Sequence, residues 1–296
     1  MRRTLLFIAL IFTALGAKAQ NSEPSRTSDI KVISYNIRLG VANDGSNSWA
    51  YRRPATIAML EEQTPDVFGV QEAHDFQISF ITENLPQYCC VGIGREDGAH
   101  KGEHMSIFYD STKVELLDWG TYWLSETPSR PSKSWGAACK RTATWTKMKM
   151  KDSGKQFFYV NTHLDHVSAL ARKNGLALVV GEIGAMNAEG LPMILTGDFN
   201  IPPSSDNLTD LNGVMKSART CAEDSDGRGS FNGWGKYGNS DSAPVWEGDR
   251  QNCPMLIDYI YYSGFSTCTS FKVLDRKYVG VPYISDHWPV TATLVF

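Results

Sequence analysis

The sequence lacks the features that define several large classes of protein. It has no apolar run as long as the roughly 20 residues that cross a bilayer, no long run of Lys and Arg, and no CxxC or Cys/His zinc spacing. It also has no motif of a serine or cysteine nucleophile, no low-complexity tract and no short internal repeat. These absences argue against a membrane-spanning protein, a zinc-binding module and an enzyme that forms a covalent intermediate.

The N-terminal residues have the pattern of a secretory signal peptide. Two arginines precede the apolar run Leu5 to Leu15, and Ala17-Lys18-Ala19 provides a small-x-small cleavage pattern. The run is about half the length of a transmembrane anchor, and no Cys follows it that would carry a lipid. We therefore expect residues 1–19 to be removed, residues 20–28 to form a tail, and the product to be a soluble protein that is secreted or periplasmic.

The charge of the chain is slightly acidic. The full sequence has 29 Lys and Arg against 32 Asp and Glu, and loss of residues 1–19 removes Arg2, Arg3 and Lys18, which leaves 26 against 32, a net charge of −6. Tight binding of nucleic acid regardless of its sequence requires Lys and Arg to neutralise phosphates. We therefore expect no stable nucleic-acid complex.

Cysteine is present at six positions: Cys89, Cys90, Cys139, Cys221, Cys253 and Cys268. In an exported chain such residues can form one or more disulfides, but their pairing cannot be read from the sequence. Neighbouring residues of a strand face opposite sides, so at most one of Cys89 and Cys90 readily meets a given partner. These cysteines are expected to be structural rather than catalytic.

Residues 29–296 are expected to form a single domain of the α/β class. Apolar and polar side chains alternate between Lys31 and Leu39, which is the periodicity of a strand. Further strand candidates are 67–72, 88–94, 104–109, 114–119, 143–150, 156–162, 192–198, 256–262 and 289–295, and helical candidates are 54–63, 75–85 and 167–187. About ten strands are too many for one short sheet, so we expect two sheets packed face to face with helices on their outer faces.

A segment rich in Gly, Ser, Asn and Asp interrupts this pattern between Asp226 and Gln251. It is expected to be a long loop, yet it carries the aromatic residues Phe231, Trp234, Tyr237 and Trp246. Long loops within a compact domain are often functional. The aromatic residues either serve a binding site or pack the loop down.

Polar clusters follow the expected strands at the point where each strand ends. They are Asn36, Gln71-Glu72, Asn161-Thr162-His163, Gly197-Asp198-Phe199-Asn200 and Ser285-Asp286-His287. Core packing gives no reason for such a recurrence, and in facing sheets the clusters would meet at one edge. Phosphoester hydrolysis requires a positioned water, neutralised phosphoryl oxygens and a stabilised leaving oxygen. The clusters therefore predict a metal-dependent site of this kind.

The ordered blocks SYN, QE, NTH, GDFN, DY and SDH resemble those of the endonuclease/exonuclease/phosphatase superfamily. This group includes pancreatic deoxyribonuclease, abasic-site endonucleases, inositol polyphosphate 5-phosphatases, bacterial sphingomyelinases and deadenylases. The similarity runs from Val32 to Val290, almost the whole chain after the leader. It implies a four-layer α/β/β/α sandwich of two mainly antiparallel sheets with a divalent-ion cleft. It does not identify the substrate, since loops and site residues determine function within a fold.

The metal ligands implied by the resemblance are Asn36, Glu72 and Asp286. Glu72 is the expected principal ligand, Asn36 is a neutral oxygen donor beside the same ion, and Asp286 contributes directly or through water. Oxygen ligands suit Mg²⁺, which keeps several waters in such sites. The expected cofactor is therefore Mg²⁺, with Mn²⁺ as a possible substitute.

The expected catalytic residues are His163, Asp198, Asn200, Asp258 and His287. His287 is expected to take a proton from the attacking water or to orient that water, with Asp258 fixing the imidazole through its other nitrogen. Asp198 would orient the water or handle the proton of the leaving group. Asn200 and His163 would donate to phosphoryl oxygens.

Substrate-binding candidates are Arg38, Arg172 and Trp234. Either arginine could hold a second substrate anion, or be an ordinary solvated arginine, which is the commoner outcome. Some nucleases of the superfamily have an acid at the position of Arg38, so a second metal site is in doubt. The segment Trp123 to Glu126, together with Trp135 and Arg141, is a candidate wall of the cleft or a part of the core.

The expected function is therefore that of a secreted, Mg²⁺-dependent phosphoesterase, acting as a monomer on a phosphomonoester or phosphodiester. The acidic charge favours a small phosphorylated substrate, such as a sugar or inositol phosphate or a small phosphodiester. The alternative within the same chemistry is a nuclease or a sphingomyelinase-type phosphodiesterase. The alternative of another class is a non-catalytic protein that binds a phosphorylated ligand.

Overall fold

The computed structural model describes residues 29–237 and 255–296. The expected signal peptide and tail, Trp246 and Cys253 lie outside these residues.

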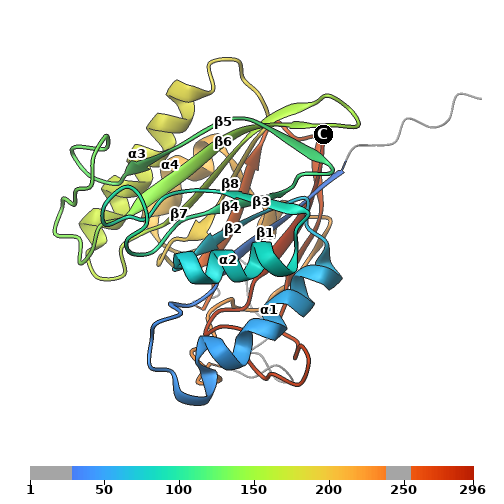
Figure 1. The fold of residues 1–296 in the computed structure, drawn as a ribbon. Helices are drawn as coiled ribbons and strands as arrows, with labels where there is room; N and C mark the ends of the chain where they lie inside the picture. The colour runs from blue at the N-terminus through green and yellow to red at the C-terminus, as the bar shows by residue number, and fades with distance from the viewer. Residues whose placement is uncertain (1–28, 238–254) are drawn as a thin grey trace, which may run out of the picture.

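Two β-sheets face each other across the centre of the molecule (Figure 1). The first sheet has seven strands, in the order β10 (Asp224–Ser225), β12 (Thr267–Val273), β13 (Val290–Val295), β1 (Asp29–Asn36), β2 (Val67–Gln71), β4 (Ile107–Asp110) and β3 (Tyr88–Val91). The second has six, in the order β5 (Val114–Trp123), β6 (Thr142–Met150), β7 (Gln156–His163), β8 (Met193–Asp198), β11 (Asp258–Ser263) and β9 (Lys216–Ser217).

Most neighbouring strands are antiparallel, as expected. Only β1 with β2, β7 with β8, and β10 with β12 run parallel among the strand pairs of the described residues. β1 lies in the interior of its sheet, where it pairs with β13 on one side and with β2 on the other. The parallel pairs bring the carboxyl ends of β1 and β2, and of β7 and β8, to the same edges of the two sheets.

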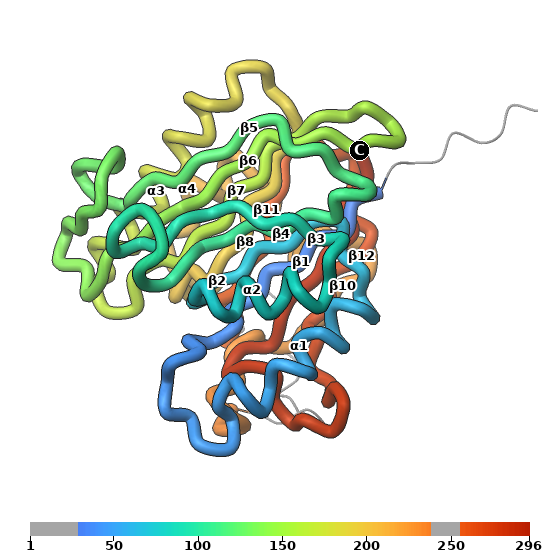
Figure 2. The backbone as a smooth tube through the Cα atoms, viewed as in Figure 1, coloured from blue at the N-terminus to red at the C-terminus, as the bar shows by residue number. Residues whose placement is uncertain are grey.

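Helices cover the outer faces of both sheets (Figures 1 and 2). Helices α1 (Trp49–Gln63) and α2 (Asp75–Asn84) lie against the first sheet, and α3 (Ala169–Met186) and α4 (Thr209–Val214) against the second. Shorter elements are η1 (Gly45–Asn47), η2 (Asp206–Leu208) and α5 (Ala218–Cys221). The expected four-layer α/β/β/α sandwich is confirmed.

Three apolar clusters correspond to the three interfaces between these layers. The central one joins side chains of the first sheet, such as Val32 and Ala292, to side chains of the second, such as Tyr159 and Ile260. The outer clusters pack α1 and α2 on the first sheet and α3 on the second. Each sheet therefore buries both of its faces, and the positions of its strand ends are fixed from both sides.

The short elements α4, α5, β9 and β10 were not expected, and three longer ones, β12, β5 and α1, differ from the expectation for local reasons. Strand β12 was not expected, because a bulge between Cys268 and Ser270 breaks its alternation of buried and exposed residues. A similar irregularity between Leu116 and Asp118 accompanies the extension of β5 to Trp123. Helix α1 begins at Trp49 rather than at Pro54, because burial of the Trp49 side chain stabilises the first turn.

None of the helices among the described residues is long and apolar enough to cross a membrane. Within the same part of the chain Cys89, Cys90, Cys139, Cys221 and Cys268 are all free thiols. No two of the described cysteines are therefore joined in a disulfide.

Candidate active site

Polar residues at the ends of strands from both sheets line a pocket of about 480 Å³. The expected site residues that line it are Arg38, Glu72, His163, Asp198, Asn200, Asp286 and His287. Asn36 and Asp258 are buried directly behind them and are hydrogen-bonded to the residues of the lining. The expected meeting of these clusters at one edge of the sandwich is thus what the structure shows.

Asp258 and His287 form a buried pair. Oδ2 of Asp258, at the start of β11, lies 2.8 Å from Nδ1 of His287, and Nε2 of the same ring lies 3.7 Å from Asp198. Burial opposes the charged imidazole, but the carboxylates of Asp258 and Asp198 outweigh it and raise the pKa of His287 to about 10. His287 is therefore held as a cation beside the pocket.

Asp198, at the end of β8, lies on the other side of the His287 ring from Asp258. Its Oδ1 accepts the backbone N–H of Asn200 at 2.9 Å, and its Oδ2 accepts the side-chain amide of Asn36 at 2.9 Å. Burial and the charge of Asp258 raise the pKa of Asp198 to about 7, against the opposing effect of His287. Asp198 can therefore gain or lose a proton close to neutral pH.

Glu72 directly follows β2 and is held by two hydrogen bonds. Its Oε1 accepts the amide N–H of Asn36 at 3.0 Å, and its Oε2 accepts the backbone N–H of Leu39 at 2.9 Å. Burial favours the protonated form, but these hydrogen bonds outweigh burial and lower the pKa of Glu72. The carboxylate of Glu72 is therefore ionised and oriented.

The amide of Asn36 is oriented differently from the expectation. We expected its oxygen to face a metal ion, whereas its nitrogen donates to both Glu72 and Asp198. The oxygen instead accepts the backbone N–H of Arg38 at 3.0 Å. In this arrangement Asn36 fixes the spacing of two carboxylates from different sheets.

These carboxylates fit a hard divalent cation. Glu72 and Asp286 line the same pocket; burial raises the pKa of Asp286, His287 lowers it and the charge of Glu72 raises it again. A cation beside both groups would relieve their repulsion, and carboxylate oxygen is the donor that Mg²⁺ and similar ions prefer. Asp198, Asp258 and His287 also have ligand atoms within 4.8 Å of one another, but the hydrogen bond between Asp258 and His287 already uses one atom of each.

His163 and Asn200, at the ends of β7 and β8 in the second sheet, line another side of the pocket. The side-chain nitrogen of Asn200 lies 3.1 Å from Nε2 of His163 and donates to the carbonyl of Leu164 at 3.2 Å. Burial lowers the pKa of His163 well below its ordinary value, and the nearby guanidinium groups of Arg141 and Arg95 lower it further. His163 is therefore neutral, with a buried Nδ1 that has no protein partner.

A model of the Endonuclease/Exonuclease/phosphatase family matches residues 33–287. The chain belongs to this family. Enzymes of the endonuclease/exonuclease/phosphatase family are hydrolases that act on phosphoester bonds and depend on divalent metal ions.

Several solved structures of the family resemble the chain over almost its whole length. The mannosyl-6-phosphatase of Bacteroides thetaiotaomicron is 33% identical, with a TM-score of 0.82 over 90% of this chain and 100% of that one. A family member from Bacteroides vulgatus is 32% identical, with a TM-score of 0.80 over 90% of this chain and 98% of that one.

A curated relative of the family is more distant. Nocturnin of Drosophila melanogaster is 26% identical over 205 residues, which make up 62% of this chain and 30% of that protein. The chain thus spans less than a third of the length of this relative.

Backbone strain is concentrated at the centre of this family member's site. Among the described residues, seven that are not glycine have a positive φ, and four of them are expected site residues: Arg38, Glu72, Asn200 and Trp234. Such backbone conformations cost of order 1–3 kcal/mol each and persist where the surrounding structure over-determines them. At Glu72 and Asn200 the positive φ turns the chain sharply at a strand end, so that the side chain enters the pocket.

The three substrate-binding candidates have different surroundings. Arg38 lines the pocket, but both Nε and Nη2 donate to Asp44 at 3.0 Å and Nη1 lies 3.7 Å from Asp286. Arg172 does not line the pocket, and it donates to the carbonyl of Asp165. Trp234 also lies outside the lining, 5.9 Å from the guanidinium of Arg52.

The pocket also contains side chains that the sequence did not single out. These are Arg95, Glu103, Cys139 and His166, alongside Arg141, which was expected to wall the cleft, and Phe231, one of the aromatic residues noted in the long loop. Phe231 lies against the ring of His287, with centroids 4.9 Å apart. Arg95 and Glu103 belong to the connection between β3 and β4, where no motif marks them.

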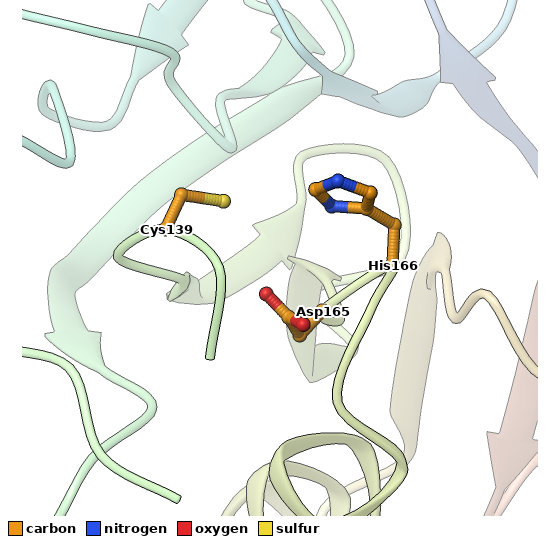
Figure 3. Close-up of side chains that lie close together, drawn as sticks. All are labelled: Cys139, Asp165 and His166. Atoms are coloured by element: carbon orange, nitrogen blue, oxygen red, sulfur yellow. The ribbon is translucent and has the colours of Figure 1, made fainter. Parts of the chain in front are cut away.

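A second group of possible metal ligands lies near Arg141. Figure 3 shows Cys139, Asp165 and His166 facing a common space. However, Arg141 donates to Nδ1 of His166 at 2.9 Å, and its Nε lies 3.8 Å from Asp165. The guanidinium of Arg141 is always charged and already interacts with His166 and Asp165, so the group does not suit a metal ion.

Two residues of the QE and NTH blocks hold the sheets together beneath the pocket. Nε2 of Gln71 in the first sheet donates to Oδ1 of Asn161 in the second at 2.7 Å. The nitrogen of Asn161 donates to the carbonyls of Val70 and Ser106 at 2.8 and 3.1 Å. These amides therefore set the distance between the two sheets rather than contact a substrate.

The described part of the long loop is hydrogen-bonded to the segment Ser285-Asp286-His287. Backbone N–H groups of Asn232 and Gly233 donate to the carbonyl of Asp286 at 2.9 and 3.0 Å. Oγ of Ser230 accepts the N–H of Asp258 at 3.1 Å. This part of the loop thus joins the segment of Asp258 to that of His287, and Phe231 packs on the imidazole.

Proposed function

We propose that the protein is a divalent-metal-dependent phosphatase that releases phosphate from a small phosphorylated sugar. The observation that carries this proposal is the buried chain from Asp258 through His287 to Asp198, set beside Glu72 and Asp286 in one pocket. Support for the substrate class comes from the similarity to a mannosyl-6-phosphatase that is covered over its full length. The net acidic charge also favours a small substrate over a polynucleotide.

The metal ion proposed is Mg²⁺, which Glu72 and Asp286 would hold. When bound it would neutralise charge on the phosphoryl group and favour a deprotonated water. Asn36 fixes the Glu72 carboxylate through its amide N–H at 3.0 Å. The backbone N–H of Leu39 fixes the other oxygen of the same carboxylate.

Asp198 is the proposed acceptor of the proton from the attacking water. A general base works best when its pKa lies near the working pH, and burial together with Asp258 raises the pKa of Asp198 to about 7. His287 is held as an imidazolium by Asp258. It can therefore donate a hydrogen bond to a phosphoryl oxygen or return a proton to the leaving oxygen.

The phosphoryl oxygens are proposed to lie between His287, His163 and Asn200. Asn200 is fixed by its backbone hydrogen bond to Asp198, and its side-chain N–H groups point to His163 and Leu164. A phosphoryl oxygen would replace His163 or the Leu164 carbonyl as the acceptor of these N–H groups, and donors held in place in this way stabilise the charge that develops in the transition state. Water attacks phosphorus, the bond to the sugar oxygen breaks, and the sugar leaves with a proton.

The test is release of phosphate or of the alcohol product by the purified protein, with Mg²⁺ and with chelator. The panel contains mannose 6-phosphate, inositol phosphates, a bis-aryl phosphodiester, sphingomyelin and single-stranded DNA. Chelator-sensitive release from the sugar phosphate is expected. Cleavage confined to a diester would replace the proposal with the nuclease or sphingomyelinase alternative, and binding without turnover would favour a non-catalytic protein.

We also propose that the protein is exported, on the strength of the pattern in residues 1–19. Sequencing the N-terminus of the protein from its natural source is expected to give Gln20. An N-terminus at Met1 would contradict export by this route.

A further inference from the structure

The pocket extends from the proposed phosphate position toward β6. Residues 140 and 141 directly precede β6, and β6 lies next to β7, whose end carries His163. Neighbouring strands are about 4.8 Å apart, so Arg141 starts from a position two strands away from the end of β8, which carries Asp198. Side chains near the start of β6 are therefore placed to contact the leaving group rather than the transferred phosphoryl group.

Arg141 is a buried cation whose hydrogen-bonding capacity is largely unused. It is 5% exposed and lines the pocket. Nη2 donates to His166, while Nε and Nη1 have no hydrogen-bond partner in the protein. A buried donor without an acceptor costs free energy, and more when it is charged. A ligand that accepts from this guanidinium would recover that free energy.

Glu103 provides acceptors at the same end of the pocket. The N–H of Arg95 donates to the backbone carbonyl of Glu103 at 3.0 Å, and the two side chains form an ion pair of 2.7 Å. A carboxylate has about four lone-pair sites, so this pair leaves further capacity for a ligand hydroxyl. The backbone and side-chain contacts together hold both residues in place.

The charges at this end are balanced. Arg95 is paired with Glu103, and Nε of Arg141 lies 3.8 Å from the buried carboxylate of Asp165. A second phosphate would find no net positive charge here. Hydroxyl groups, which both donate and accept, match a wall that offers guanidinium N–H groups and carboxylate oxygens side by side.

The other end of the pocket is less suited to this role. The guanidinium of Arg38 makes two hydrogen bonds to Asp44 and lies near Asp286. Its donors are therefore largely occupied.

We propose that Arg95, Glu103 and Arg141 form a subsite for the hydroxyl groups of the leaving sugar, and that Arg141 determines specificity for a polyhydroxylated leaving group. This inference rests on the proposed function. In this subsite the guanidinium of Arg141 donates to a sugar oxygen, while Glu103 accepts from a sugar hydroxyl. The exposed ring of His166 accepts a hydrogen bond from Arg141 in the structure, and a sugar oxygen replaces it as the acceptor when the ligand binds.

The test compares two phosphomonoesters in wild type and Arg141→Gln. Mannose 6-phosphate carries hydroxyl groups on its leaving group, and p-nitrophenyl phosphate carries none. We expect kcat/KM for the sugar phosphate to fall about 10- to 100-fold in the variant. For p-nitrophenyl phosphate it should change less than about threefold, and inhibition by inorganic phosphate should be unchanged.

Equal losses on both substrates, with weaker inhibition by phosphate, would overturn the subsite and assign Arg141 to the phosphoryl group. No loss on either substrate would also overturn it. Glu103→Gln provides a second variant with the same expected selectivity, in case Arg141→Gln does not fold. Arg53→Gln is the matched control, since Arg53 is exposed and lies over Phe80, outside the pocket.

Calorimetry separates this inference from the proposed function. If wild type hydrolyses no phosphoester, the proposed function fails, yet binding can still be compared. Wild type should bind mannose 6-phosphate more tightly than inorganic phosphate, and Arg141→Gln should remove that difference. Equal affinities for the two ligands in wild type would contradict the subsite whether or not the protein is an enzyme.

Discussion

At the scale of single residues, the proposed chemistry depends on a hydrogen bond of 2.8 Å between Asp258 and His287. Asp258→Asn keeps the shape of the side chain but removes the charge that holds the imidazolium. Loss of a well-placed acid–base group typically costs 10²- to 10⁴-fold in rate. We therefore expect kcat to fall by about this factor in a protein that keeps its fold, which circular dichroism verifies. A rate close to that of wild type would remove His287 from the proposed mechanism.

Asp165 gives a prediction about stability rather than rate. Its carboxylate accepts the backbone N–H groups of Ala138, Val167 and Ser168 at 2.7 to 3.0 Å. Burial raises its pKa, but these hydrogen bonds outweigh burial, so the pKa lies below its ordinary value. The stabilisation is therefore present above the unfolded pKa of about 3.9 and is lost as the pH falls through the folded value.

We accordingly expect Asp165→Asn to lower the free energy of unfolding by about 1–3 kcal/mol at pH 7. The difference from wild type should shrink as the pH falls below about 4. Urea unfolding at pH 7, 5 and 3.5 measures it. A difference that grows toward acid pH would show that the carboxylate is not ionised in the folded protein.

The sequence identified the residues at strand ends because periodicity locates the end of a strand. Asp198 and His287 are placed together by the topology, which the ordered blocks implied. Arg95 and Glu103 could not be found in this way, because their connection carries no periodicity and approaches β6 only in three dimensions. The orientation of the Asn36 amide depends on the backbone of Arg38, which has a positive φ that the sequence does not reveal.

At the scale of elements, β2 packs against the second sheet at a point where only glycine fits. A Cβ on Gly69 would lie 2.5 Å from the Asn161 side chain and 2.7 Å from Oγ1 of Thr196. We expect Gly69→Ala to lower the free energy of unfolding by about 1–3 kcal/mol, the usual cost of overpacking. Chemical denaturation measures it.

Gly184→Ala is the matched control for this substitution. Gly184 lies in α3, and nothing lies within 4 Å of a Cβ built there. Alanine in a helix interior is more favourable than glycine by up to about 1 kcal/mol, so this variant should be as stable as wild type or more so. Equal destabilisation by both substitutions would mean that the contact between the sheets is not the cause.

Strands with a clear apolar pattern were predicted over most of their length, whereas β5, which has an irregularity, was predicted only as far as Trp119 and β12 was not predicted. β1 and β7 bury their apolar side chains in register and match the expected spans within a few residues. β12 carries an irregularity between Cys268 and Ser270 that hides its period from the sequence. The first turn of α1 likewise depends on the burial of Trp49 by residues distant in sequence.

At the scale of the whole molecule, hydrogen bonds connect the proposed metal site, on the first sheet, to the second sheet. Glu72 follows a strand of the first sheet, and its partner Asn36 also binds Asp198 of the second. A ligand that binds only the folded state stabilises it by about 2.7 kcal/mol at 100 times its Kd. We expect Mg²⁺ at such a concentration to raise the melting temperature by roughly 5–10 °C.

Glu72→Gln should remove most of this rise, measured for each protein relative to its own melting temperature in chelator. Differential scanning calorimetry with titrated Mg²⁺ tests both statements. Glu61→Gln, the same change at an exposed position of α1, serves as a charge control. An undiminished rise in Glu72→Gln would place the ion elsewhere.

The layered architecture was predictable because the number of strands required two sheets and the helical patterns required outer layers. The order of the strands within each sheet was not, since alternation shows that a strand has a buried face but not which strand lies beside it. The family resemblance provided the architecture, and the buried amides of Gln71 and Asn161 provide the physical reason that the two sheets remain in register.

The position of β1 has a consequence for how the chain acquires its structure during synthesis. Among the described strands β1 is synthesised first, yet one of its two neighbours in the sheet is β13, with Asp29 opposite Val295. Domains generally fold as units, and contacts between residues distant in sequence form slowly. The centre of the first sheet therefore stays open until almost every other element has been made, and a nascent chain stalled before β13 would expose both its unpaired edge and its apolar face.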